Sequence, residues 1–423
     1  MIFLILNKLN KIKKFPFYFL MPVPYAIGTA SEQILVAANY ARIKKKKLKI
    51  IYLSFFSKIL QYRICNKALF TELTINKFGC RLNILIRIII YPFLEIEYLI
   101  LRILIILNNF TFKFQVDSIY KFSPIGGSDM YNTKKITNKN FWKKKLKDIP
   151  KLNYKKNLID LIKKKKNICK KELQSMKTER TNKIICLHVR DSHYKNDHKR
   201  KNYRNSDINR YIKTIKFLIN QGYLVVRMGS VKSKKFKFTH KYFINYPDTT
   251  LIKKSAAMEL YLIQKAKYFI GTQSGIYDTA IMFGKPTLLT NMIHLTTFPL
   301  KKEDRGLFRS IFDKKTKNKI LINKYINYSW SYHDPNSEIH NIKFVENTED
   351  EIYKATVEFL KLKTNKITYL QKKLNYKIKK SISKMFSYKN YNKIKSEQTN
   401  ILRKIRIRKT CEGSLSNFNL INI

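Results

Sequence analysis

Short apolar runs with two different periods alternate along the second half of the chain. Runs typical of buried strands lie at 184–189, 223–228, 242–247, 267–271 and 287–291, and runs with a helical period of about 3.6 residues lie between them at 207–221, 258–266 and 276–284. Gly222 is a predicted C-terminal cap for the first of these helices, and Thr348 with Glu351 is a predicted capping box for a later one. Strands that alternate with helices of this length predict a parallel sheet covered on both faces.

A second α/β pattern opens the chain. Residues 17–21 and 44–53 have the composition of strands, and residues 32–42 between them carry a helical apolar face. Ser31 is the predicted N-cap of that helix, and Gly28 falls in the preceding loop. The pattern predicts a βαβ unit.

The length of 423 residues exceeds what one ordinary core holds, so the chain is expected to form two domains. The fold class that follows is α/β, with two Rossmann-like parallel-sheet domains facing a cleft. The predicted boundaries are an N-terminal domain at 1–150, a basic connector at 151–180, a C-terminal domain at 181–362 and a peripheral tail rich in lysine and asparagine at 363–423.

The formal net charge is +58, from 86 basic and 28 acidic residues. Such a charge suits nucleic acid, an anionic membrane surface or anionic substrates. Lysine, however, is abundant throughout, together with Ile, Asn, Tyr and Phe, which is the composition that an AT-rich genome gives to any protein. The charge is therefore discounted as a sign of function, and a nucleic-acid partner is not expected.

The five cysteines are scattered and form no pair or cluster at zinc spacing; they are Cys65, Cys80, Cys169, Cys186 and Cys411. Neither a metal nor a cofactor is expected, and a reduced, cytoplasmic compartment fits best. In residues 1–15 an apolar run precedes the lysines, which is the reverse of the order in a signal peptide.

Residues 82–107 are strongly apolar, but Arg87, Glu95, Glu97 and Arg102 interrupt them. Because a spanning helix needs about 20 largely uncharged residues, no transmembrane segment is predicted. Two interpretations of this segment stay open: a core helix of the first domain, and an amphipathic helix lying on the anionic inner face of a membrane.

A small polar loop separates the predicted strand at 267–271 from the helix that follows it. The loop consists of Thr272, Gln273, Ser274 and Gly275. It would lie at the carboxyl edge of the sheet and at a helix N-terminus, where free backbone N–H groups favour phosphate. An ordinary βα turn is the alternative, since serine and glycine are common in such turns.

A second strand ends in His188, Val189 and Arg190. The guanidinium of Arg190 suits bidentate contact with a diphosphate, and His188 points to the same side of the strand. Asp191 is a candidate general base. Taken singly, an arginine at a strand end is usually a salt-bridge partner, and a lone histidine is more often a structural residue.

Further polar residues follow other predicted strands. Arg227 and Gly229 lie at the junction between the predicted strand at 223–228 and the loop after it, and Asp248 is a candidate hydrogen-bond acceptor for a nucleoside. The loop after Arg190 contributes Tyr194, Arg204 and Asn205 as candidates for contact with a second substrate, although a solvated loop explains most of its polar residues.

Together these segments resemble a family of bacterial proteins assigned as glycosyltransferases and related to the fucosyltransferase-like enzymes of the GT-B fold. The resemblance covers roughly 180–360 and includes IICLHVRDSHY, GYLVVRMGS and KYFIGTQSGIYDTAIMFGKPTLLTNM; PYAIGTASEQ at 24–33 resembles the first domain of that family. It implies metal-independent transfer from a nucleotide-sugar donor held by the C-terminal domain, with Arg190 on the diphosphate and Ser274 with Gly275 on the phosphates. Aspartate follows the HVR sequence where many relatives have a basic residue or glycine, so the GDP-fucose assignment does not carry over.

The resemblance also makes the N-terminal domain the acceptor side, where Gly28 and Thr29 lie and where Glu32 is a reserve general base. The expected function is sugar transfer to a glycan or lipid-linked acceptor in cell-surface polysaccharide synthesis. Two alternatives stay open: a nucleic-acid-binding protein that uses its basic charge, and a catalytically inactive binding protein of the same fold.

Overall fold

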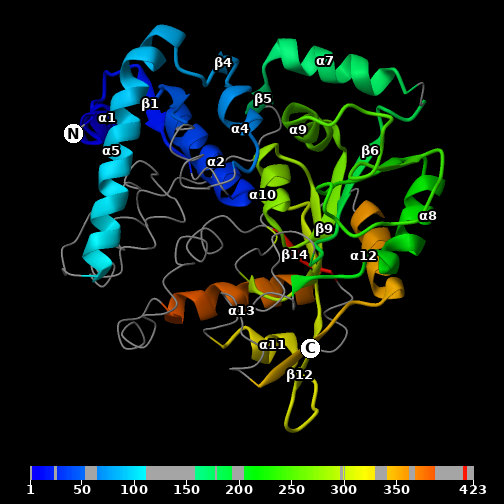
Figure 1. The fold of residues 1–423 in the computed structure, drawn as a ribbon. Helices are drawn as coiled ribbons and strands as arrows, with labels where there is room; N and C mark the ends of the chain where they lie inside the picture. The colour runs from blue at the N-terminus through cyan, green and yellow to red at the C-terminus, as the bar shows by residue number, and fades with distance from the viewer. Residues whose placement is uncertain are drawn as a thin grey trace. The chain divides into compact units, whose positions relative to one another are not determined.

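A computed structural model describes eleven stretches of the chain: 2–22, 26–52, 64–110, 158–176, 179–192, 204–295, 299, 301–328, 341–361, 367–385 and 413–416. The chain divides into two compact units (Figure 1). Unit 1 comprises Met1–Asn167 with Met282–Gly284, and unit 2 comprises Ile168–Ile281 with Lys285–Ile423. The division after Asn167 falls inside helix α7 (Lys163–Gln174), in the segment interpreted as a connector, and the predicted boundary at residue 150 lies outside the described residues.

Unit 1 holds two small sheets and two longer helices. Its elements are α1 (Ile2–Lys11), β1 (Phe17–Leu20), α2 (Ile27–Ile43), β2 (Lys47–Ile50), α4 (Ala68–Thr71), β3 (Leu73–Ile75), β4 (Phe78–Gly79), α5 (Ile84–Phe110) and β5 (Ile159–Leu161). Strands β1 and β2 are parallel and joined by α2, which confirms the predicted βαβ unit. Strand β3 pairs in antiparallel fashion with β4 and β5.

Helix α2 begins earlier than the sequence predicted. Gly28 and Thr29 lie in its first turn rather than in a loop, and Ser31 is buried inside the helix rather than capping it. The reason is burial: Ala30 lies four residues before Ile34, on the same fully buried face, so packing extends the helix by about one turn toward its N-terminus.

Unit 2 is built on one parallel sheet of seven strands. These are β6 (Ile184–His188), β7 (Leu224–Arg227), β8 (Phe243–Asn245), β9 (Tyr268–Thr272), β10 (Thr287–Met292), β11 (Arg305–Phe308) and β14 (Ser414–Leu415), in the order β14-β11-β10-β9-β6-β7-β8. The five strands predicted from the sequence are all present, and all are parallel.

Helices cover both faces of this sheet, as Figure 1 shows for α9 (Ala256–Lys265) and α10 (Gly275–Met282) on one side and α8 (Ile212–Asn220) and α12 (Glu349–Lys361) on the other. The core beneath α8 and α12 includes Leu187, Leu218 and Phe359. A 3₁₀ turn at Ile208–Tyr211 leads into α8. Residues 184–187 of β6 and 224–226 of β7 are all apolar because both faces of the sheet are covered.

Both predicted caps are confirmed. Gly222 has φ +81°, and its N–H donates to the Ile219 carbonyl at 2.9 Å while the Tyr223 N–H donates to the Leu218 carbonyl at 3.1 Å, which together form a Schellman motif. The Thr348 N–H donates to Glu351 Oε2 at 2.9 Å, and the Glu351 N–H donates to Thr348 Oγ1 at 3.2 Å.

The C-terminal segment predicted as a peripheral tail contributes to the fold of unit 2. Strand β14 pairs with β11 at the sheet edge, and α13 (Tyr369–Met385) holds it in place. Gln371 Nε2 donates to the Leu415 carbonyl and Asn375 Nδ2 donates to the Gly413 carbonyl, both at 2.7 Å. The remaining elements are α11 (Ile322–Tyr325) and the antiparallel pair β12 (Ser310–Asp313) and β13 (Ile342–Val345).

Candidate functional site

The strand order of unit 2 reverses between β6 and β9. From β6 the chain moves outward through β7 and β8, and then returns to the other side of β6 to build β9, β10 and β11. In open parallel sheets, ligands bind beyond the carboxyl ends of the strands at such a reversal. The residues that follow β6 and β9 are therefore the first place to look for a site.

The two strands approach each other closely at this edge. His188 is paired with Gly271, and a Cβ atom added at position 271 would lie 2.3 Å from the His188 carbonyl oxygen. Since real Cβ contacts are never that short, only glycine fits here. The glycine lets the loop after β9 begin directly beside the end of β6.

Ser274 and His188 meet across this edge. Ser274 Oγ lies 3.0 Å from His188 Nδ1. Desolvation of the imidazole, aided by the Arg227 and Arg190 guanidinium groups, lowers the pKa of His188 to about 3. The imidazole is therefore neutral at physiological pH, and it orients the serine hydroxyl rather than acting as a general base, which would need a pKa near the working pH.

Arg190 is anchored on both its backbone and its side chain. Its N–H donates to Thr272 Oγ1 at 2.9 Å, and its Nε donates to Asn205 Oδ1 at 3.3 Å. The Arg190 carbonyl in turn accepts the Ser206 N–H at 2.9 Å. The half-buried guanidinium is thus held at the reversal point, between the end of β9 and the 204–206 loop.

A second guanidinium comes to the same edge from that loop. Arg204 Nη2 donates to the Gln273 carbonyl at 2.9 Å. Helix α10 begins two residues later, at Gly275, so its N-terminal N–H groups lie beside this contact. Asp278 in its first turn is buried and reduces the positive potential of this helix end. Two arginines, a serine hydroxyl and a helix start nevertheless combine into an arrangement suited to an anion.

Arg227 and Asp191 are committed to contacts within unit 2. Arg227 is 1% exposed, and its guanidinium donates to Asn245 Oδ1 at 3.1 Å and to the Lys234 carbonyl at 2.7 Å. Asp191 Oδ2 lies 3.9 Å from Arg227 Nη2 and accepts the Lys234 N–H at 2.9 Å. Both residues fasten the loop after β7 to the end of β6, so we assign them a positioning role.

Three other residues that the sequence predicted to bind the nucleotide-sugar donor contact protein groups instead. Gln273 is buried: its Nε2 donates to the His294 carbonyl at 2.7 Å and its Oε1 accepts the Ile293 N–H at 2.8 Å. Exposed Asp248 accepts from Asn245 Nδ2 at 2.8 Å. A Cβ atom at Gly229 would lie 2.7 Å from Ser233 Oγ, so this glycine serves loop packing.

Sequence reasoning missed Arg309, which follows β11. Its buried guanidinium donates to the Asn205 carbonyl and, at 2.9 Å, to Ser206 Oγ. Glu346 lies 3.9 Å from it. Arg309 thereby supports the loop that carries Arg204 and Asn205. The run RGLFRSIF around it has strand composition and was the available signal.

The remaining candidates lie elsewhere. Gly28, Thr29 and Glu32 belong to helix α2 of unit 1, and Tyr194 lies outside the described residues. Among the described residues, no group of His, Cys, Asp and Glu side chains is arranged to hold a metal ion.

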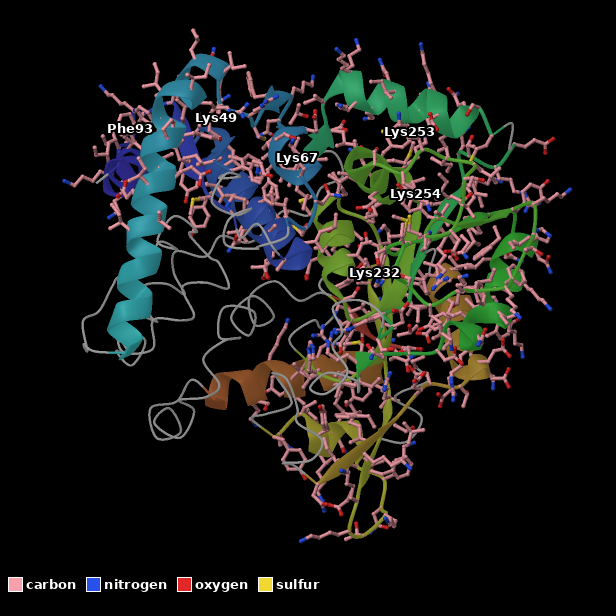
Figure 2. The ribbon with its side chains drawn as sticks, in the orientation of Figure 1. Lys49, Lys67, Phe93, Lys232, Lys253 and Lys254 are labelled. Atoms are coloured by element: carbon pink, nitrogen blue, oxygen red, sulfur yellow. The ribbon has the colours of Figure 1, made fainter. Side chains whose placement is uncertain are left out.

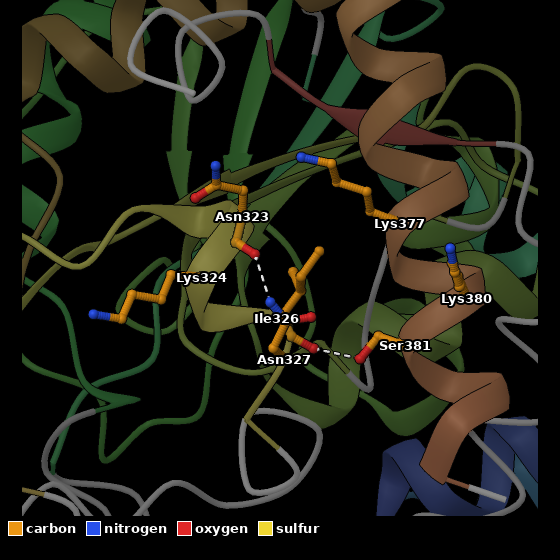
Figure 3. A pocket seen from close by; sticks show the side chains of 7 residues that line it. All are labelled: Asn323, Lys324, Ile326, Asn327, Lys377, Lys380 and Ser381. Atoms are coloured by element: carbon orange, nitrogen blue, oxygen red, sulfur yellow. Dashed lines mark hydrogen bonds between the residues drawn. The ribbon is translucent and has the colours of Figure 1, made fainter. Parts of the chain in front are cut away.

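Unit 2 also contains a basic cavity away from this edge. It has a volume of about 450 Å³ and lies between α11 and α13 (Figure 3). Its lining residues are Asn323, Lys324, Ile326, Asn327, Lys377, Lys380 and Ser381. Ser381 Oγ donates to the Ile326 carbonyl at 2.7 Å, which fastens the two helices together. None of the candidate residues predicted from the sequence lines this cavity. A variant of a cavity residue can therefore serve as a control for a variant at the edge of β6 and β9.

The comparisons with known proteins give no further assignment. No protein-family model, no curated protein and no solved structure matches the chain.

Proposed function

We propose that unit 2 binds the diphosphate of a nucleotide-sugar at the carboxyl edge of β6 and β9, and that the chain transfers the sugar to a hydroxyl acceptor. The observation that carries the proposal is the meeting of Arg190, Arg204, Ser274 and the start of α10 at the reversal of strand order. The two arginines and the Ser274–Gly275 loop are far apart in the sequence, and each group favours a phosphate oxygen.

In the proposed reaction, the acceptor hydroxyl oxygen attacks the anomeric carbon, the bond from that carbon to the diphosphate oxygen breaks, and the hydroxyl proton is released to solvent water. Negative charge then develops on the departing diphosphate. Arg190 and Arg204 stand where they can neutralise it, in the role that arginine, lysine or Mg²⁺ plays in other phosphate clamps. We assign no proton transfer to Asp191, because its carboxylate is held by Arg227 and the Lys234 N–H.

The choice of a sugar nucleotide, rather than another phosphate compound, rests on the resemblance of 180–360 to the glycosyltransferase family. In a GT-B arrangement unit 2 would be the donor side, and unit 1, with its βαβ motif, the acceptor side. The proposed setting is the assembly of surface polysaccharide from glycan or lipid-linked acceptors on the cytoplasmic side.

Thermal unfolding of the purified chain with GDP, UDP, CMP and ADP tests the proposal. A ligand at 100 times its dissociation constant adds about 2.7 kcal/mol of stability, which corresponds to a rise of roughly 5 to 10 °C for a unit of this size. We expect one nucleoside diphosphate to give this rise and its sugar conjugate to be hydrolysed slowly. A rise without hydrolysis or transfer would indicate an inactive binding protein, and no rise with any nucleotide would contradict the proposal.

A further inference from the structure

Helix α5 of unit 1 presents a continuous apolar stripe to solvent. Leu85, Ile89, Phe93, Ile96 and Ile100 recur every third or fourth residue and are between 50 and 67% exposed. Figure 2 labels Phe93 on this helix. At about 1.5 Å of rise per residue, the stripe from Leu85 to Ile100 is about 22 Å long. An exposed apolar surface of this kind marks a site of contact with another protein or with a membrane.

The opposite side of α5 fixes its orientation. Leu94 is fully buried in a core that contains Leu6 of α1 and Phe19 of β1, and Ile90 and Tyr91 pack against the same core. One face of α5 therefore packs against the core of unit 1, and the stripe lies on the exposed face of the same helix. Glu95 is buried and does not belong to the stripe, and half-buried Glu97 lies at its edge by helical geometry rather than among its exposed apolar side chains.

Positive charge lies next to this helix. Helix α1 packs against α5, and exposed lysines occupy its C-terminal end and the turn after it, namely Lys8, Lys11, Lys13 and Lys14. Each lysine near an anionic bilayer contributes attraction, whereas two copies of a chain with a net charge of +58 repel each other. The charge therefore favours an anionic lipid surface over a second copy of this chain as the occupant of the stripe.

We propose that the α5 stripe lies in the interface of an anionic lipid bilayer, with the lysines of α1 against the headgroups. The helix lies along the surface, as amphipathic interfacial helices do. None of the helices in the described part of the chain combines the length and apolar character needed to cross a bilayer. This inference is independent of the proposed sugar transfer, because it concerns unit 1 alone.

The test is sedimentation of the full chain with vesicles of phosphatidylcholine alone and with about 30 mol% phosphatidylglycerol. We expect binding to the anionic vesicles that is at least about tenfold stronger than to the neutral ones. The variant Ile89→Asp/Phe93→Asp should lose at least about tenfold in binding to anionic vesicles, because it places two charges in the stripe.

The control is Val231→Asp/Leu251→Asp, which changes two side chains of unit 2 that are 68 and 66% exposed. It adds the same charge at similar exposure and should bind vesicles within about twofold of the wild type. Equal losses in both double variants, or no preference of the wild type for anionic vesicles, would overturn the proposal. So would a dimer, seen by sedimentation velocity without lipid, that the stripe variant alone abolishes. Circular dichroism confirms the fold of each variant.

Discussion

Replacing Arg190 with alanine is expected to weaken binding of the nucleoside diphosphate by roughly 10- to 150-fold. A hydrogen bond to a charged group contributes about 1.5 to 3 kcal/mol, and this range gives the expected loss of affinity. The loss should be large because the arginine is held in place before the ligand arrives: Thr272 Oγ1 fixes its backbone and Asn205 Oδ1 fixes its Nε. Isothermal titration calorimetry measures the change directly.

Two further variants distinguish specific binding of the diphosphate by Arg190 from non-specific attraction to a positively charged protein. Arg190→Lys keeps the charge but loses the planar fork, so its affinity should lie between those of the wild type and Arg190→Ala. Lys377→Ala removes one charge from the basic cavity at α11 and α13 and should change affinity by less than about twofold. If Arg190→Ala and Lys377→Ala lose affinity equally, the sheet edge is not the binding site.

Replacing Gly271 with alanine is expected to destabilise unit 2 by about 3 kcal/mol, because strands β6 and β9 must separate to admit the new Cβ atom. The contact of 2.3 Å is with the His188 backbone carbonyl, which cannot rotate away as a side chain would. The change should lower the midpoint of thermal unfolding by roughly 10 °C. Differential scanning calorimetry of the full chain gives this value.

Gly79→Ala in β4 is the matched control. A Cβ atom at Gly79 meets nothing within 4 Å, so alanine there should not disturb the folded state. Stability should stay unchanged or rise by about 0.4 to 1 kcal/mol, because alanine lowers the conformational entropy of the unfolded chain. If Gly271→Ala unfolds at the same temperature as Gly79→Ala, the strands are farther apart than the structure has them.

The sequence predicted strands β6 to β10 of unit 2 because cover on both faces makes them nearly uniform apolar runs. It also predicted both caps, since glycine at a positive φ and the Thr348–Glu351 pair depend on local chemistry alone. Strand β14 could not be predicted. It has two residues, and its place in the sheet depends on Gln371 and Asn375 of a helix far from it in the sequence.

The outcome for the candidate site residues likewise depends on contacts between residues that are not neighbours in a local pattern. Arg190 and Arg227 both stand at the ends of predicted strands and look equivalent in the sequence. They differ because the loop at Lys234 folds back over Arg227, so that its guanidinium bonds the Lys234 carbonyl and is buried. Gly28 was misassigned for a similar reason, since burial of Ala30 extends α2 through it.

Amide hydrogen exchange with and without the nucleoside diphosphate that gives the largest thermal shift tests the central claim most directly. If the diphosphate lies at the edge of β6 and β9, amides at 272–279 should exchange more slowly in the complex, and those of α13 at 369–385 should be unchanged. Protection at 369–385, or saturating binding that leaves exchange at 272–279 unaltered, would contradict the account.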